Sequence, residues 1–243
     1  MPIRAHAVPI LSDNYAWLLR DEATGATALV DPADAGACIA AVEAAGGRLD
    51  LILLTHHHQD HIAGVDVVRA RYGCPVVGAA ADARRLPRLD RAVREGDVVE
   101  LGGTALRVIE TPGHTVGHIS FVSEGGAPVL LCGDTLFSLG CGRLMEGTAA
   151  DMFASLRKLG ALPAGTLVCC GHEYTQSNAR FALHVDGGNA ALRTRAGEVD
   201  RLRAAGQATV PSVLGDELAE NPFLRAPDAA ALGALRSQKD EFR

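Results

Sequence analysis

Apolar and polar residues follow two different patterns on either side of residue 174. Before it, short apolar runs of strand length are separated by turn residues; after it, apolar positions recur at helical spacing. Strands are predicted at residues 3–8, 15–20, 26–31, 49–55, 75–78, 98–101, 105–109, 119–123, 128–131 and 166–170. Helices are predicted at residues 34–45, 62–72, 151–159, 174–185, 189–205, 213–219 and 229–239. The pattern therefore predicts an α/β domain at residues 1–173 and a small helical C-terminal domain at residues 174–243. We expect the second to pack on the first, because about 70 residues are few for an independent core.

Several predicted strands lead directly into histidine or aspartate. Apolar runs that end at Thr55, Leu131 and Cys170 precede the segment 56–61, Asp134 and His172, respectively. A further histidine, His114, lies in a loop between two strands. Polar groups delivered to strand ends in this way typically assemble an active site at one edge of a sheet scaffold.

The densest cluster is Thr55-His56-His57-His58-Gln59-Asp60-His61. In an extended chain, residues two apart point to the same side, so His56 and His58 can face one metal while His57 faces away. The alternatives are a tag or a solvated loop, with Asp60 serving only to cap a helix that begins near Ile62. The position of the cluster, directly after a core strand and far from either terminus, favours a metal site.

The candidate ligands form a set too large for one four-coordinate metal. They are His56, His58, Asp60, His61, His114, Asp134 and His172. Mixed imidazole and carboxylate ligands suit zinc, iron or manganese, and a pair of such ions can share one bridging carboxylate. Two adjacent divalent metals lower the pKa of water to about 7 and favour hydrolysis. The sequence therefore predicts a hydrolase with two divalent metal ions, zinc being the first choice.

Neighbouring polar residues have simpler interpretations. His57 is expected to make a structural hydrogen bond or to face solvent, and His118 to support the site or to lie satisfied in the core. Cys132 is expected to pack within its strand, and Glu173 to begin the helix that follows His172.

Composition narrows the class of protein further. Hydrophobic residues make up 48% of 243 residues, and the net charge of −6 argues against nucleic acid as the main partner. No apolar run reaches the roughly 20 residues of a membrane helix, and the first residues lack a signal-peptide core. The six cysteines are scattered, as expected for reduced, buried thiols. We therefore expect a cytoplasmic protein without a membrane or nucleic-acid partner.

The motifs resemble those of the metallo-β-lactamase superfamily. The segment 55–61 resembles its His-x-His-x-Asp-His signature, and residues 111–118, Gly133-Asp134 and Gly171-His172 resemble its later metal motifs in the expected order. This resemblance implies an αββα sandwich with a dinuclear metal site at one edge.

Within that superfamily the chain is similar to the glyoxalase II (hydroxyacylglutathione hydrolase) family. The stretches that carry this similarity are Asp13-Asn14-Tyr15, Gly140-Cys141-Gly142-Arg143, Glu146-Gly147-Thr148, Gly171-His172-Glu173-Tyr174-Thr175, Asn221-Pro222-Phe223-Leu224-Arg225, Arg236 and Lys239-Asp240. The family pattern assigns the first metal to His56, His58 and His114. It assigns the second metal to Asp60, His61 and His172, with Asp134 as the bridge. It implies that Arg143, Tyr174, Arg236 and Lys239 bind glutathione. Met145 departs from the pattern, because an aromatic residue is common there in the family.

The implied reaction is hydrolysis of S-(2-hydroxyacyl)glutathione, such as S-D-lactoylglutathione, to a 2-hydroxy acid and glutathione, the second step of methylglyoxal detoxification. A metal-bridging hydroxide would be the nucleophile, and the catalytic residues Asp60 and Asp134 would act as ligands. We expect a monomer. The alternatives are a β-lactamase, a nuclease or phosphodiesterase, and a non-enzymatic metal-binding protein; the β-lactamases met most often use a cysteine ligand at the position of Asp134.

Overall fold

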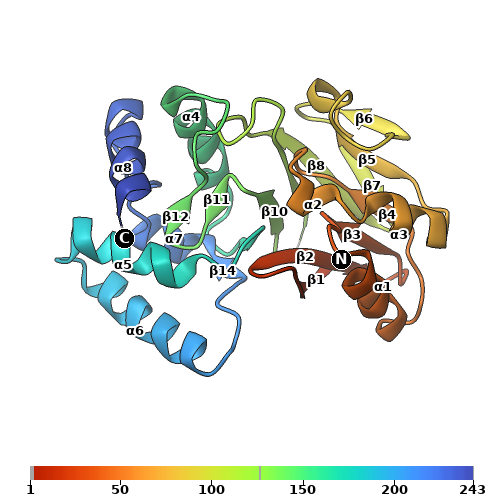
Figure 1. Cartoon of the computed structure of the whole chain (residues 1–243), viewed down its shortest axis with the longest axis horizontal. Helices are drawn as coiled ribbons and strands as arrows, with labels where there is room; N and C mark the ends of the chain where they lie inside the picture. The colour runs from red at the N-terminus through yellow and green to blue at the C-terminus, as the bar shows by residue number, and fades with distance from the viewer. Residues whose placement is uncertain (1–2, 126, 243) are drawn as a thin grey trace.

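Two six-stranded sheets face each other at the centre of the computed structural model, which describes residues 3–125 and 127–242 (Figure 1). The first sheet has the order β1 (Ile3–Ile10), β2 (Asn14–Asp21), β3 (Thr27–Val30), β4 (Leu51–Leu53), β5 (Val76–Ala79) and β6 (Arg91–Val93). The second has the order β14 (Ser212–Val213), β13 (Leu167–Cys170), β10 (Val129–Gly133), β9 (Ile119–Ser123), β8 (Thr104–Glu110) and β7 (Val98–Leu101). The ends of the predicted domains at residues 1–2 and 243 lie outside the described residues.

The position of β4 in the fold explains why its sequence is apolar without interruption. Leu53 packs into the core between the sheets, whereas Ile52 and Leu54 pack into a second cluster on the outer face of the first sheet. Successive side chains of a strand point to opposite faces, so a strand covered on both sides needs apolar residues throughout. The second cluster includes Val42 of α1 (Ala35–Ala44) and Val68 of α3 (Val65–Tyr72).

The second sheet is covered on its outer side by α4 (Ala149–Gly160) and by the C-terminal helices. Leu156 of α4 belongs to the same core cluster as Leu106 and Leu131 of the second sheet. Thr148 caps α4, accepting from the backbone N–H of Asp151, whose carboxylate in turn accepts from the backbone N–H of Thr148. The αββα sandwich predicted from the sequence is confirmed.

The C-terminal region consists of α5 (Thr175–Asp186), α6 (Ala190–Ala204), α7 (Leu214–Glu220) and α8 (Ala229–Glu241). It packs on the sandwich: Phe181 of α5 and Phe223 stack with ring centroids 5.9 Å apart inside the core cluster that also contains Leu156. Strand β14 also belongs to this region, pairing with β13 at the edge of the second sheet. The region is therefore helical, as predicted, apart from these two strand residues.

The structure differs from the sequence prediction at several short elements. The predicted helix 62–72 is divided into α2 (Gln59–Ile62) and α3, with Gly64 between them. A Cβ at Gly64 would lie 2.4 Å from the carbonyl oxygen of Pro32, so the chain passes too close for a side chain. The prediction missed β6, β14 and the hairpin of β11 (Leu136–Phe137) and β12 (Gly140–Cys141). Two or three residues are too few to establish an alternating pattern.

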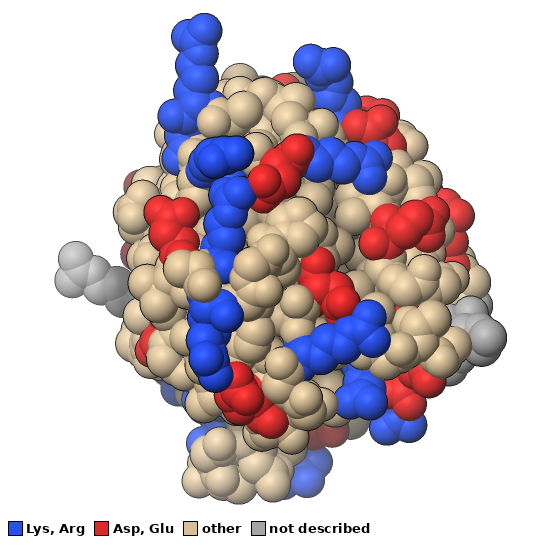
Figure 2. All heavy atoms as spheres, turned by 90° about the vertical axis from the view of Figure 1, so that its right-hand side faces the viewer, with Lys and Arg blue, Asp and Glu red and all other residues tan. Residues whose placement is uncertain are grey.

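Charged side chains of both signs share the surface that contains α3. Figure 2 shows basic side chains beside acidic ones on this face. Two residues of α3 form ion pairs: Arg69 with Asp90 at 2.7 Å and Arg71 with Glu43 at 3.2 Å. In the described part of the chain, no helix is both long and apolar enough to cross a membrane.

Candidate metal centre and adjoining pocket

The segments that carry the predicted ligands converge at one end of the sandwich. Strand β4 of the first sheet leads to His56 and His58, and the loop before β9 contributes His114. In the second sheet, β10 and β13 run parallel and pair Gly133 with Cys170. Because parallel neighbours end at the same edge, Asp134 and His172 emerge side by side.

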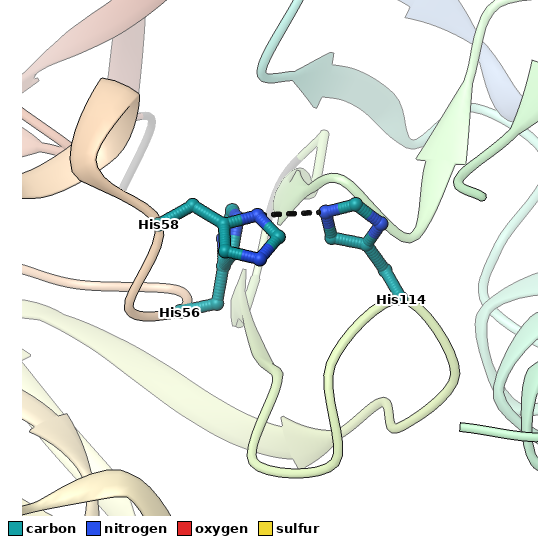
Figure 3. Close-up of side chains that lie close together, drawn as sticks. All are labelled: His56, His58 and His114. Carbon is teal, nitrogen blue, oxygen red and sulfur yellow. Dashed lines mark hydrogen bonds between the residues drawn. The ribbon is translucent and has the colours of Figure 1, made fainter. Parts of the chain in front are cut away.

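A first group consists of His56, His58 and His114, whose ligand atoms lie within 4.8 Å of one another (Figure 3). His58 Nδ1 and His114 Nε2 are 3.0 Å apart, and the rings of His56 and His58 have centroids 4.7 Å apart. His57 points elsewhere, with its Nδ1 3.0 Å from Asp82 Oδ2. The alternation expected for residues 56–58 is therefore present.

A second group consists of Asp60, His61 and His172, again within 4.8 Å of one another. The Nε2 atoms of His61 and His172 are 3.4 Å apart, and His172 Nε2 is 3.5 Å from Asp60 Oδ2. The carboxylate of Asp134 lies between the two groups, with Oδ2 3.5 Å from His114 Nε2 and 3.3 Å from His172 Nε2. The structure thus brings all seven predicted ligands together.

The donor atoms fit divalent metal ions. Two ligands of a tetrahedral zinc ion, with Zn–N of about 2.0–2.1 Å, lie about 3.3–3.4 Å apart, close to most of these separations. Among the described buried atoms, His56 Nε2 and Asp134 Oδ1 have no hydrogen-bond partner. Buried polar atoms without partners are costly, and a cation between them would supply the missing interaction.

Each predicted histidine ligand of the second group has its other ring nitrogen held by a carboxylate. Asp31 Oδ2 lies 3.0 Å from His61 Nδ1, and Asp13 Oδ1 lies 2.9 Å from His172 Nδ1. Asp31 also accepts from the backbone N–H and the hydroxyl of Thr55, at 2.9 and 2.6 Å. Contacts of this kind orient a metal-binding imidazole and fix its tautomer.

Other contacts hold His56, His114 and Asp60. Thr55 Oγ1 is 3.0 Å from His56 Nδ1, and the carbonyl oxygen of Arg143 is 2.9 Å from His114 Nδ1. Asn14 Nδ2 donates to Asp60 Oδ2 at 3.0 Å. Asp60 lies inside α2 rather than at its N-cap, so capping does not account for it.

Asp31 was not predicted to be part of the site, and Asp13, Asn14 and Thr55 were predicted only as members of motifs. The sequence offered one signal, since Asp31 ends an apolar run and precedes Pro32. In the structure Asp31 adopts φ 52, which is uncommon for a residue with a side chain. Its role nevertheless depends on the position of His61, 30 residues later.

The electrostatics of the cluster favour a positive charge between carboxylates. Burial, together with His61 and His118, holds the pKa of His56 well below its usual value, so this ring is a neutral donor. Burial lowers the pKa of His61, but Asp134 and Asp31 raise it well above its usual value. Burial raises the pKa of Asp134, but His61 and His172 hold it well below the ordinary range. The two carboxylates on either side of the His61 ring, Asp31 at Nδ1 and Asp134 at Nε2, therefore favour positive charge there.

A pocket of about 480 Å³ adjoins the cluster, and all the predicted substrate-binding residues line it. These residues are Arg143, Tyr174, Arg236 and Lys239, together with Met145, which is exposed. The ring of Tyr174 stacks on that of His172, with centroids 4.5 Å apart. The pocket is therefore lined both by metal-type ligands and by basic side chains.

Two of the basic side chains of the pocket are at least partly buried. Arg236 is 5% exposed, and its Nη1 donates to the carbonyl oxygen of Cys141 at 2.8 Å, while Nη2 lies 3.0 Å from Asp240. Lys239 Nζ donates to the carbonyl and hydroxyl oxygens of Ser177 at 2.9 and 2.8 Å. Arg236 Nε is buried and has no hydrogen-bond partner among the described residues. A buried guanidinium with an N–H group left to donate favours an anionic ligand.

The remaining candidates have supporting contacts. His118 Nε2 accepts from the backbone N–H of Asp134 at 3.1 Å. Cys132 donates to the carbonyl oxygen of Leu136. The expectation that Glu173 begins a helix is wrong, because α5 starts at Thr175 with Tyr174 as its N-cap. Glu173 instead accepts from Tyr15 Oη and from the backbone N–H of Thr209, both at 2.9 Å.

Comparisons with known proteins cover almost the whole chain. The model of the metallo-beta-lactamase superfamily matches residues 11–172, and the model of the hydroxyacylglutathione hydrolase C-terminus matches residues 173–242. A hydroxyacylglutathione hydrolase of Acidiphilium cryptum is 61% identical over 97% of this chain and 95% of its own. Another, of Rhodospirillum rubrum, is 58% identical over 92% of this chain and 87% of its own.

Solved structures have the same fold. ETHE1 from Myxococcus xanthus is 26% identical with a TM-score of 0.71, covering 98% of this chain and 90% of that one. TTHA1623, in a di-iron-bound form, is 26% identical with a TM-score of 0.62, covering 90% of this chain and 99% of that one. BLEG-1, a B3 metallo-beta-lactamase, is 25% identical with a TM-score of 0.69, covering 91% of this chain and 99% of that one.

Proposed function

The chain belongs to the hydroxyacylglutathione hydrolase family of the metallo-β-lactamase superfamily, and we infer that it hydrolyses S-(2-hydroxyacyl)glutathione thioesters, typified by S-D-lactoylglutathione. The products are a 2-hydroxy acid, here D-lactate, and glutathione. One observation carries this conclusion: a single pocket is lined by metal-type ligands and also by Arg236 and Lys239. A thioester with an anionic tail matches both kinds of residue.

We propose that the cluster holds two divalent metal ions. His56, His58 and His114 would bind the first, Asp60, His61 and His172 the second, and Asp134 both. Zinc is our first choice, and iron and manganese suit the same donors. The di-iron-bound form of TTHA1623 supports a two-metal site in a related fold. When bound, such ions polarise a carbonyl group and acidify water.

The residues of the chain orient the substrate in the pocket. Arg143, Arg236 and Lys239 supply positive charge for the carboxylates of glutathione, and a guanidinium can bind a carboxylate in bidentate fashion. Tyr174, which stacks on His172, would place the glutathione part beside the cluster. Binding of the glutathione tail restricts the position of the thioester carbonyl beside the cluster. This restriction lowers the entropic part of the activation barrier.

The leaving group needs little help from the protein. A thiolate whose conjugate acid has a pKa of about 8.5 departs without a strong general acid. The absence of a need for a strong general acid agrees with this site, because Asp60 and Asp134, the carboxylates of the cluster that line the pocket, are assigned to the metals. Their catalytic role would be to hold those ions rather than to transfer a proton.

We propose a boundary between a catalytic domain, residues 1–173, and a glutathione-binding domain, residues 174–243. The junction of the two family models at residues 172 and 173 supports it. The cytoplasm is proposed because all six cysteines are unpaired and buried. We propose that nucleic acid is not a partner, because the net charge is −6. We propose a monomer because the exposed large apolar residues are scattered along the chain, from Leu11 to Leu218.

The test is steady-state hydrolysis of S-D-lactoylglutathione, with metal content measured on the same sample. We expect turnover with close to two metals per chain. A fully metallated sample without turnover would contradict the proposal, and β-lactams and phosphodiesters would then be tried before a non-catalytic role.

A further inference from the structure

The hairpin β11–β12 forms part of the wall of the pocket, where Phe137 packs against His172 and the carbonyl oxygen of Cys141 accepts from Arg236. Phe137 and Cys141 of this hairpin both line the pocket. The Phe137 ring packs edge-on against Tyr174, with centroids 5.3 Å apart. The wall therefore contributes directly to the space in which the substrate would lie.

This hairpin has little stability of its own. Each strand has only two residues, and a two-stranded hairpin is marginal in water even when longer. Its turn contains Leu139 at φ 57, a left-handed conformation that side chains disfavour. Something outside the hairpin must hold it in place.

The C-terminal region supplies that support through side-chain hydrogen bonds to the hairpin backbone. Asn221 Nδ2 donates to the carbonyl oxygens of Phe137 and Gly140, at 3.1 and 3.0 Å. Glu217 Oε2 accepts from the backbone N–H of Leu139 at 2.7 Å. Asn221 is fully buried and Glu217 is 1% exposed, so water does not compete for these groups.

Two further side chains complete the arrangement. Asn178 of α5 donates to the carbonyl oxygen of Ser138 at 3.1 Å, and Arg236 of α8 donates to that of Cys141. Helices α5, α7 and α8 or the residues next to them thus each hold the hairpin. The fit is close: a Cβ at Gly140 would lie 2.4 Å from Asn178 Nδ2.

Two of the predicted metal ligands are held by contacts outside the hairpin. Asp134 is anchored to His118 by its backbone N–H, and His114 to the carbonyl oxygen of Arg143. Neither contact is made by a residue of the hairpin, although Phe137 packs edge-on against His172 with ring centroids 6.0 Å apart. A loosened hairpin would therefore disturb mainly the pocket wall, while the hydrogen bonds that hold Asp134 and His114 remain.

We propose that Asn221, Glu217 and Asn178 are positioning residues, which set the pocket wall at Phe137 and Cys141 for binding of the glutathione thioester. This inference rests on the proposed function. None of the three was assigned to the metals or, from the sequence, to the substrate. Asn221 and Glu217 act through the hairpin, whereas Asn178 both holds the hairpin and lines the pocket. The C-terminal region thereby shapes the pocket beyond its own basic residues.

Asn221→Asp provides the main test, since it keeps the size of the side chain but replaces a double donor by a carboxylate facing two carbonyl oxygens. We expect KM for S-D-lactoylglutathione to rise about tenfold or more, with kcat changed by less than about threefold and metal content unchanged. The inhibition constant of glutathione should rise in parallel. A folded, metallated Asn221→Asp with wild-type KM would overturn the inference.

Glu217→Leu is the second variant, and it decides the question if Asn221→Asp does not fold, because Glu217 does not line the pocket. It removes the acceptor for the backbone N–H of Leu139 without adding a charge, so a smaller increase in KM, about threefold, is expected, and an unchanged KM would then overturn the inference. Asp21→Asn is the matched control: Asp21 is also buried and accepts from the Thr104 hydroxyl at 2.7 Å, at the end of β2 opposite Asn14. It should lower the Tm and leave KM unchanged. Absence of turnover by the wild-type protein would instead refute the proposed function.

Discussion

Asp31 and His61 form a buried contact, with Asp31 Oδ2 3.0 Å from His61 Nδ1 on the side of the ring opposite Nε2. Nε2 lies 3.4 Å from Asp134 Oδ1. The imidazole is therefore held between a supporting carboxylate and the proposed bridging ligand. This relationship makes the second metal site depend on a residue that follows β3, 30 positions before His61.

Asp31→Asn is expected to weaken binding of the second metal about 10–100-fold, because an amide supports the imidazole less well than a carboxylate does. Metal titration followed by elemental analysis would measure it. Asp82→Asn is the matched control: Asp82 is also buried and contacts a histidine, but His57 is not a predicted ligand. Equal losses of metal in both variants would contradict the assigned role of Asp31.

Asp60→Asn should reduce metal content toward one ion per chain and lower kcat together, because the amide loses the charge that the second ion requires. Elemental analysis and steady-state kinetics on the same sample measure both. Full metal content with a reduced rate would contradict a ligand role and would favour one in proton transfer.

Binding of the substrate should weaken above pH 8. Burial, together with Arg236 and Arg143, lowers the pKa of Lys239 to about 8. The ammonium is charged below this pH and neutral above it, so its attraction for a carboxylate is lost as the pH rises through about 8. KM measured from pH 6.5 to 9.5 should increase over that range.

Lys239→Arg should flatten this profile, because guanidinium remains charged at these pH values. A KM that rises equally in the variant would attribute the pH dependence to another group.

Removal of the metals should destabilise the fold, because it leaves the buried His56 Nε2 and Asp134 Oδ1 without partners. Ligands present at 100 times their Kd stabilise by about 2.7 kcal/mol, which corresponds to a Tm lower by about 5–10 °C after treatment with EDTA. Differential scanning fluorimetry would detect the shift, and added zinc should reverse it. An unchanged Tm in protein verified to be metal-free would contradict a buried metal centre.

The secondary structure near the site and the orientation of its histidines could be predicted from the sequence. The apolar run at residues 51–54 predicted a strand buried on both faces, and the alternation of His56, His57 and His58 predicted which rings face inward. Helices such as α4, α5 and α6 have enough residues to display a 3.6-residue period. Periodicity is a local property, so it needs no knowledge of the fold.

The support of the site was decided by tertiary structure alone. Asp31 meets His61 across 30 positions, and Asn221 meets Phe137 across 84. The hairpin β11–β12 is too short to produce a pattern, and its stability comes from side chains that arrive from the C-terminal region. A sequence specifies which residues can donate or accept a hydrogen bond, but only the packed fold determines which of them are excluded from water and left with a single partner.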